Sequence, residues 1–298
     1  MSKSYKELLD TSHLIQSKSK ENAKLFIEKG IWNNISTLTL NQWLNNFVSE
    51  EEKLLSAFLL NSFIYRSDVQ TNSLLKNAFN SVLPSTLEKN VWKVLEQENF
   101  LGTLTLDYKT NKDIRIVPVI RNTDDPTKSG PLLARLYRRN ININSKHFIW
   151  NWQINEAIEE GAKVIIFIDD MIGSGNQFSE FIEKCDINFE SARFIYLPLL
   201  ACKQGLIFLS EKIPDLEVSP VEVVDNDINF FGQHEIYSDL KDLYIKVEKD
   251  KLNSRFLRKF SCGYENLALT ISYSHGTPNA TLPLYWYESD KFYPLVRR

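Results

Sequence analysis

The sequence has few of the residues that cross-link small folds or hold structural metals. Its 298 residues include three cysteines, Cys185, Cys202 and Cys262, an odd number without a CxxC spacing. This pattern argues against a disulfide framework and a zinc site, and it favours a reducing compartment. The N-terminal residues lack the apolar core of a secretory signal, and no apolar run approaches the length of a membrane span. We therefore expect a soluble, cytoplasmic protein with no membrane partner.

A strong net charge is also absent. Thirty-five Lys and Arg residues face 38 Asp and Glu residues, a formal net charge of −3. This balance differs from the global basic charge of a dedicated nucleic-acid binder, although a local basic patch is compatible with it. The hydrophobic content of 43% suffices for a sizeable core, arranged as one large domain or two small ones.

The first hundred residues have helical periodicity and no catalytic motif. Apolar positions fall on one helical face over 40–47 and on another over 54–59. A further helix over 74–79 is expected to break at Pro84, and the pattern resumes over 91–95. We interpret this region as a helical layer packed on the core.

Strand and helix patterns alternate after Gly102. Strands are predicted over 103–106, 114–120, 164–168, 194–200 and 216–224, and helices over 132–140, 150–161, from 177 onward and over 203–212. The strand over 164–168 lacks polar alternation, as in a parallel sheet buried on both faces. The prediction is an α/β fold with a mostly parallel sheet. We expect three parts: a helical region over 1–100, the α/β core over 101–232, and a C-terminal extension over 233–298 that borders the cleft and begins with a helix over 237–247.

One segment carries chemistry. From Ile168 to Gln177 the chain reads Ile-Asp-Asp-Met-Ile-Gly-Ser-Gly-Asn-Gln, directly after the buried strand. Ligands of open α/β sheets bind at the carboxyl ends of strands. Glycines let a backbone approach an anion, and N–H groups at the start of a helix favour a phosphate. The adjacent Asp169 and Asp170 are positioned to accept hydrogen bonds from sugar hydroxyls or to approach a hydrated metal ion.

Three other motifs could account for parts of this segment. Ser174 and Gln177 also fit a capping box, in which the serine hydroxyl only starts a helix. Burying adjacent carboxylates is costly, however, so the acidic pair favours a ligand site. The sequence contains no GxxxxGK[ST], which disfavours a P-loop, and Phe178 replaces the third glycine of a dinucleotide-binding GxGxxG.

The apolar strand, the acidic pair and the small-residue loop resemble the phosphoribosyl pyrophosphate (PRPP) motif of type I phosphoribosyltransferases. A closer resemblance is to the phosphoribosyltransferase-like proteins of prokaryotic conflict systems, the PRTase-CE type. It is carried by Asp-Asp-Met-Ile-Gly-Ser-Gly-Asn-Gln, by His-Gly-Thr-Pro-Asn-Ala-Thr-Leu-Pro-Leu-Tyr-Trp over 275–286, and by the helical stretch from Trp43 to Tyr65.

This resemblance implies a fold of the type I phosphoribosyltransferase kind and roles for named residues. Asp169 and Asp170 would be catalytic and hold the ribose, and the 5′-phosphate would lie on Gly173, Ser174, Gly175, Asn176 and Gln177. It implies Mg²⁺, brought with a pyrophosphate ligand and without a direct protein ligand. Gly173 and Gln177 stand where the usual loop has threonines, so two alternatives stay open: a related ligand, such as a nucleotide, in place of PRPP, and binding without turnover.

A second loop and a C-terminal pair complete the candidate residues. Arg121, Lys128, Ser129 and Gly130 follow the strand over 114–120 and would bind the pyrophosphate, although an ordinary solvated connection fits them equally. His275 and Asn279 are candidates for the rim of the cleft, and a structural turn is the competing interpretation.

The sequence thus predicts a phosphoribosyltransferase-like effector that binds PRPP or a related ribose phosphate. The resemblance implies an anti-phage role as a retron-type toxin, with a reverse transcriptase and its msDNA-type ribonucleoprotein as partners. The alternative is a non-catalytic PRPP or nucleotide sensor, or an interaction module that regulates a partner protein. Whether the protein is an enzyme stays open at this stage.

Overall fold

The computed structural model describes residues 5–88, 100–105, 112–121, 124, 128–225, 229–234 and 238–298. The chain divides into two compact units. The first unit comprises residues 1–71 and 226–298, and the second comprises residues 72–225. These units are defined by compactness alone, so the domain boundaries predicted at 100/101 and 232/233 stay a prediction.

A parallel sheet forms the centre of the second unit. Its strands are β2 (Ile114–Pro118), β3 (Val164–Ile172) and β4 (Arg193–Cys202), in that order across the sheet, with β5 (Glu217–Val218) and β6 (Glu222–Val224) both paired to β4. Every one of these pairings is parallel. The predicted α/β class with a mostly parallel sheet is therefore confirmed.

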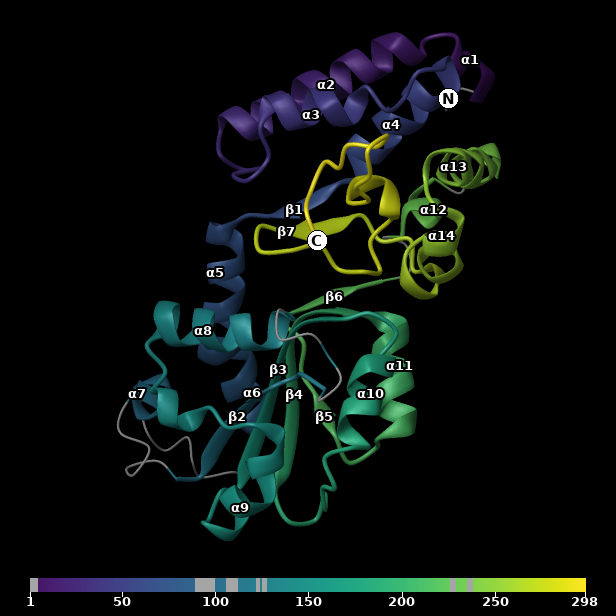
Figure 1. Ribbon diagram of the computed structural model, residues 1–298. Helices are drawn as coiled ribbons and strands as arrows, with labels where there is room; N and C mark the ends of the chain where they lie inside the picture. The colour runs from purple at the N-terminus through teal and green to yellow at the C-terminus, as the bar shows by residue number, and fades with distance from the viewer. Residues whose placement is uncertain are drawn as a thin grey trace. The chain divides into compact units, whose positions relative to one another are not determined.

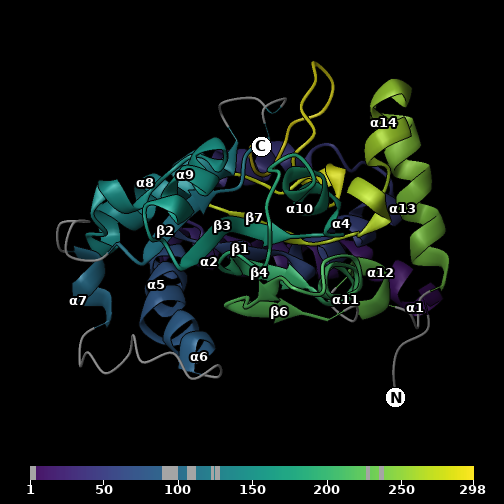
Figure 2. The ribbon, with the colours of Figure 1, turned by 90° about the horizontal axis from the view of Figure 1, so that it is seen from below.

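Helices cover both faces of this sheet. The described helical elements after residue 77 in this unit are η1 (Ala78–Val82), α6 (Leu83–Glu88), α7 (Phe100–Thr105), α8 (Ser129–Ile141), η3 (Ser145–His147), η4 (Asn151–Gln153), α9 (Ile154–Glu159), α10 (Asn176–Ile182) and α11 (Lys203–Lys212). Apolar side chains of α9, α10 and α11 pack with one face of the sheet. Helix α6 lies on the side of the sheet opposite α10 and α11 (Figures 1 and 2).

Two local predictions before β2 differ from the structure. The strand predicted over 103–106 is wrong, because residues 100–105 form the helix α7; in a segment this short, burial of Leu104 alone satisfies either structure. The predicted break at Pro84 is also wrong. Helix α5 (Asp68–Asn77) continues through the π-helical turn η1 into α6. Proline has no backbone N–H to donate, and the wider π-helical turn before Pro84 lets the helix continue without that hydrogen bond. The predicted helix over 91–95 lies outside the described residues.

The strand predicted over 216–224 is divided into β5 and β6. Pro220 lies between them and has no N–H to donate to a strand ladder. The flanking N–H groups of Ser219 and Val221 still bond to Tyr196 and Pro198 of β4, so the chain follows the edge of the sheet across the interruption.

The first unit combines the two ends of the chain. It contains α1 (Tyr5–Leu9), α2 (Ser12–Glu28), α3 (Thr37–Leu44), α4 (Glu50–Ser62), β1 (Ile64–Arg66), α12 (Phe230–Gln233), α13 (Ser238–Lys251), α14 (Ser254–Phe260), η6 (Tyr264–Asn266), β7 (Ile271–Tyr273) and η7 (Pro283–Tyr285). Strand β1 pairs in parallel with β7, although about two hundred residues separate them in the sequence.

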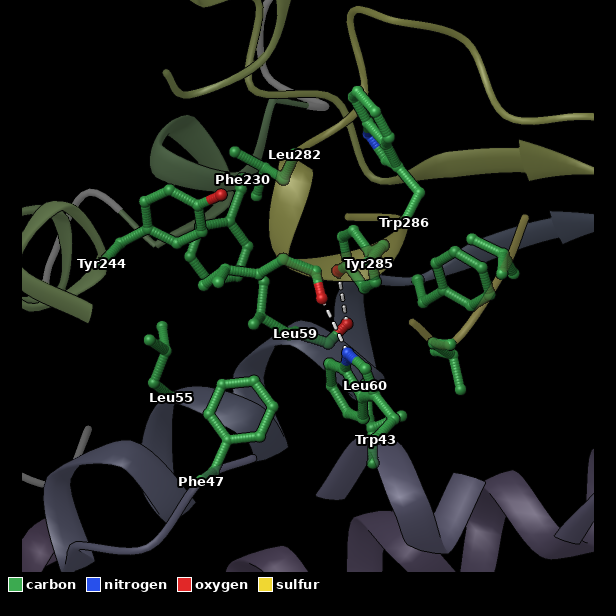
Figure 3. Close-up of a cluster of buried hydrophobic side chains, with 14 of the residues drawn as sticks. Trp43, Phe47, Leu55, Leu59, Leu60, Phe230, Tyr244, Leu282, Tyr285 and Trp286 are labelled. Atoms are coloured by element: carbon green, nitrogen blue, oxygen red, sulfur yellow. Dashed lines mark hydrogen bonds between the residues drawn. The ribbon is translucent and has the colours of Figure 1, made fainter. Parts of the chain in front are cut away.

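An aromatic core joins the two ends of the chain in this unit (Figure 3). The indole Nε1 of Trp43 donates to the carbonyl of Leu284 at 2.7 Å, and the hydroxyl of Tyr285 donates to the carbonyl of Leu59 at 2.7 Å. The Trp43 and Tyr285 side chains are fully buried. The segments 43–65 and 275–286, both part of the family resemblance, thus pack on each other as one core.

Candidate functional site

The acidic pair lies inside strand β3. The sequence predicted that the strand ends at the acids, but β3 continues to Ile172 because its last two residues pair with Leu200 and Ala201 of β4. On its other side β2 ends at Pro118, opposite Ile168. Asp169 and Asp170 therefore extend past the end of β2, where the start of α8 approaches them.

Asp169 is buried and fully hydrogen-bonded. Its side chain is 3% exposed. The Tyr196 hydroxyl donates to its Oδ2 at 3.1 Å, and the Asp170 backbone N–H donates to its Oδ1 at 2.9 Å. Burial raises the pKa of Asp169 well above its ordinary value, and the neighbouring charge of Asp170 adds to this shift. Burial and the Asp169 charge likewise raise the pKa of Tyr196.

Asp170 is half-buried and meets the second predicted loop. The Ser129 hydroxyl donates to Asp170 Oδ1 at 3.0 Å and lies 3.4 Å from Asp169 Oδ1. Ser129 is the first residue of α8, and Gly130 packs this helix start against β2: a Cβ on Gly130 would lie 2.5 Å from the Val119 carbonyl oxygen. The structure thus brings the acidic pair and Ser129 of the predicted pyrophosphate loop together.

The loop after β3 presents backbone N–H groups. Among the hydrogen bonds of the described residues, none is donated by the backbone N–H groups of Gly173, Ser174, Gly175, Gln177 or Phe178. Backbone N–H groups in proteins are nearly always paired, with water or a ligand where no protein acceptor is near. Successive unpaired N–H groups of this kind form an anion-binding concavity.

The capping-box interpretation of this loop is wrong. Helix α10 begins at Asn176, and its N-terminal cap is Gly175, which has no side chain to accept a capping hydrogen bond. The Ser174 hydroxyl only accepts a long bond, 3.4 Å, from the Asn176 N–H. The serine is therefore not committed to starting the helix.

A close glycine contact supports the loop from below. Gly175 has a left-handed φ of 89°, and a Cβ there would lie 2.8 Å from Phe208 of α11. A Cβ on Gly205, also in α11, would lie 2.2 Å from the Gly173 carbonyl oxygen. Sequence reasoning explained the loop glycines by approach to a ligand, and the structure adds packing on α11. Gly205 was missed, although a glycine inside a helix pattern was the available signal.

The predicted cations of the second loop differ from each other. Arg121 is held by two carboxylates: its guanidinium binds Asp124 in a bidentate arrangement, with the shortest contact at 2.7 Å, and also binds Glu180 of α10. The hydrogen bonds that Arg121 donates to Asp124 raise the pKa of Arg121. Lys128 caps the start of α8 without a side-chain capping bond. Sequence reasoning missed Asp124 and Glu180 as partners of Arg121.

His275 and Asn279 belong to the first unit. The imidazole of His275 stacks on Tyr273, with ring centroids 5.0 Å apart, and the Asn279 carbonyl accepts from the Tyr264 N–H at 2.8 Å. Thr281 in the same motif is fully buried, and its hydroxyl donates to the Ile271 carbonyl. These contacts give the motif a structural role inside its own unit. Its place at the rim of the cleft stays a prediction.

The raised pKa of Asp169 predicts a pH-dependent stability. The folded protein retains a proton that the unfolded chain releases near the ordinary value of 3.8. Stability from this group is therefore fully present below that pH and is lost as pH rises toward the folded pKa. Relative to Asp169→Asn, the wild-type protein should lose stability with rising pH, at a limiting slope of about 1.4 kcal/mol per pH unit.

Urea denaturation of both proteins from pH 4 to pH 8 measures this difference. Asp215→Asn, which changes an exposed carboxylate in the same unit, is the control and should give a curve parallel to the wild type. Parallel curves for Asp169→Asn as well would contradict the assignment of a raised pKa.

Comparisons with known proteins support one assignment. No curated protein matches the chain. Among solved structures, the AQ2163 protein from Aquifex aeolicus is similar at 11% identity and a TM-score of 0.31, covering 63% of this chain and 84% of its own, a likeness too distant to carry an argument. Within the described residues, no helix has the length and apolar character needed to cross a membrane. A family model described as PRTase-CE matches residues 40–298, which include the acidic pair, its loop and the C-terminal motif. The chain therefore belongs to the PRTase-CE family, and it is a phosphoribosyltransferase-like protein.

Proposed function

We propose that this protein binds PRPP or a related ribose-phosphate ligand at the segment from Asp169 to Gln177. The observation that carries the proposal is the set of backbone N–H groups of residues 173–175, 177 and 178, which donate no hydrogen bond among the described residues and lie next to a half-buried carboxylate at the end of a parallel strand. A 5′-phosphate is the kind of ligand whose oxygens would accept hydrogen bonds from such N–H groups. A sugar hydroxyl donates to Asp170, which lies upstream of the loop.

Magnesium fits this arrangement as a ligand-borne ion. Within the described residues, no group of three His, Cys, Asp or Glu side chains is placed to hold a metal. Mg²⁺ commonly binds substrate phosphates together with one or two carboxylates and several waters. Asp170 is the carboxylate suited to that role, and the ion would neutralise charge on a pyrophosphate.

Replacing Asp170 by asparagine tests this binding mode. The variant should bind ribose 5-phosphate and Mg²⁺–PRPP at least 10-fold more weakly, because a hydrogen bond to a charged group contributes about 1.5–3 kcal/mol. Isothermal titration calorimetry measures the affinities, with Asp215→Asn as the control. Unchanged affinity in Asp170→Asn would rule out this carboxylate as a sugar ligand.

One observation favours a non-catalytic sensor as the second candidate function. A transferase must stabilise the leaving pyrophosphate, and Arg121 was one of the two cations predicted for that task, with Lys128. Its guanidinium is instead held by Asp124 and Glu180. Incubation with PRPP, Mg²⁺ and a cell extract as the source of acceptors, followed by ³¹P nuclear magnetic resonance, separates the two functions. Pyrophosphate released in excess of an Asp170→Asn control identifies an enzyme, and PRPP that binds but stays intact in the presence of the extract identifies a sensor.

The proposed biological role is that of an anti-phage effector, of the retron-associated toxin type. Its support is membership of the PRTase-CE family, which the sequence resemblance connects with conflict systems. Cells expressing the wild type or Asp170→Asn with the genes that neighbour it should differ in survival after phage infection. Co-purification of a reverse transcriptase would identify the partner. Equal survival of the two strains would show that defence does not depend on the ligand site.

A further inference from the structure

The two carboxylates of the acidic pair face different surroundings. Side chains on a strand alternate between the two faces of the sheet. Phe167 pairs in register with Tyr196 of β4, and both belong to the apolar cluster beneath α10. Asp169 is two residues beyond Phe167 and shares this face, where the Tyr196 hydroxyl reaches it. Asp170 is the next residue along the strand, so it projects toward the opposite face, and its side chain is half-buried. The Ser129 hydroxyl at the start of α8 reaches both carboxylates, at 3.0 Å from Asp170 Oδ1 and 3.4 Å from Asp169 Oδ1, so burial is what distinguishes the two acids.

The oxygens of Asp169 already have donors inside the protein. Oδ2 accepts from Tyr196, and Oδ1 accepts from the backbone N–H of Asp170. The Tyr196 ring is itself held in place, since it stacks on Phe178 with centroids 3.8 Å apart. A side chain that is 3% exposed and bonded in this way is not placed to receive a sugar hydroxyl. Its bond to the Asp170 N–H instead fixes the backbone from which the Asp170 side chain projects.

We infer that only Asp170 of the pair touches the ribose, and that Asp169, held by Tyr196, is a positioning residue. This inference rests on the proposed function, because it assigns different roles to Asp169 and Asp170 within the same ligand site. Tyr196 is thereby a second positioning residue, two steps removed from the ligand. The sequence pattern Asp-Asp treats the two acids as equivalent, and the alternation of the strand makes them different.

A double-mutant cycle tests the inference by calorimetry. The readout is the ratio of the dissociation constants for inorganic phosphate and ribose 5-phosphate, which isolates the contribution of the sugar. Tyr196→Phe should lower this ratio about 2- to 10-fold, the effect of one lost hydrogen bond that orients Asp170. Tyr137→Phe is the matched control: Tyr137 is also fully buried in this unit, its hydroxyl has no hydrogen-bond partner among the described residues, and the ratio should stay unchanged.

The Asp170→Asn background gives the decisive comparison. If Tyr196 acts through Asp170, adding Tyr196→Phe to Asp170→Asn causes no further loss in the ratio. An equal loss in both backgrounds would show that Asp169 itself touches the sugar, and it would overturn the inference. So would an unchanged ratio in Tyr196→Phe, or equal weakening of phosphate and sugar phosphate, which marks a merely structural tyrosine. A wild-type protein with no preference for ribose 5-phosphate over phosphate would instead overturn the proposed function, and this inference with it.

Discussion

Replacing Gly205 by alanine is expected to destabilise the protein by about 3 kcal/mol and to abolish ribose 5-phosphate binding. A Cβ at this position would lie 2.2 Å from the Gly173 carbonyl oxygen and 2.7 Å from Ile172 Cγ2. The first of these atoms is backbone, so the loop after β3 or the start of α11 must move. Because the proposed phosphate site consists of backbone N–H groups in this loop, a shift of the loop would change the direction of every donor.

The sign of this effect separates packing from helix propensity. Inside an unobstructed helix, alanine is more stable than glycine by about 1 kcal/mol, so an open site would give stabilisation. Gly276→Ala is the control, since a Cβ there meets nothing within 4 Å and its φ is not left-handed. Urea denaturation and calorimetry with ribose 5-phosphate measure both effects. A Gly205→Ala protein as stable as the wild type, with normal affinity, would show that α11 does not support the loop.

Trp43→Ala should cost roughly 4 kcal/mol, because it leaves a large cavity in the core of the first unit. The indole is 0% exposed and contacts the rings of Phe47 and Tyr285. Its Nε1 also satisfies the buried carbonyl of Leu284 at 2.7 Å. Truncation therefore removes apolar contacts and leaves the Leu284 carbonyl without its donor, so the hydrogen bond between helix α3 and the C-terminal motif is lost.

Two further variants divide this effect and control for it. Trp43→Phe keeps most of the apolar contact and loses the hydrogen bond, and it should cost about 1–3 kcal/mol. Trp152→Ala removes an indole that is 66% exposed, and it should change stability by less than about 0.5 kcal/mol. Urea denaturation followed by circular dichroism measures all three. Equal losses for Trp43→Ala and Trp152→Ala would contradict the assignment of Trp43 to the core.

Local pattern was sufficient for much of the second unit. The helix predicted over 203–212 coincides with α11, and the buried apolar run from Val164 became the central strand β3. Both signals come from neighbours within a few residues, which is the range that periodicity measures. The wrong secondary-structure predictions occur where contacts with residues far away in the sequence determine the local structure. The predicted strand over 103–106 alternates between polar and apolar residues, yet its residues 103–105 belong to helix α7, and Pro84 is tolerated because a π-helical turn precedes it.

By itself, the sequence determined the α/β class, the parallel sheet and the position of the candidate loop, because hydrophobic periodicity, glycines and adjacent acids act locally. Only the tertiary structure decided how the candidate residues are used. It placed Tyr196 against Asp169, Ser129 against Asp170, and Arg121 between two carboxylates. It also set Gly205 beneath the loop and joined Trp43 to Leu284. Most of these contacts join residues far apart in the chain, and they depend on strand register and helix packing, which no short sequence pattern encodes.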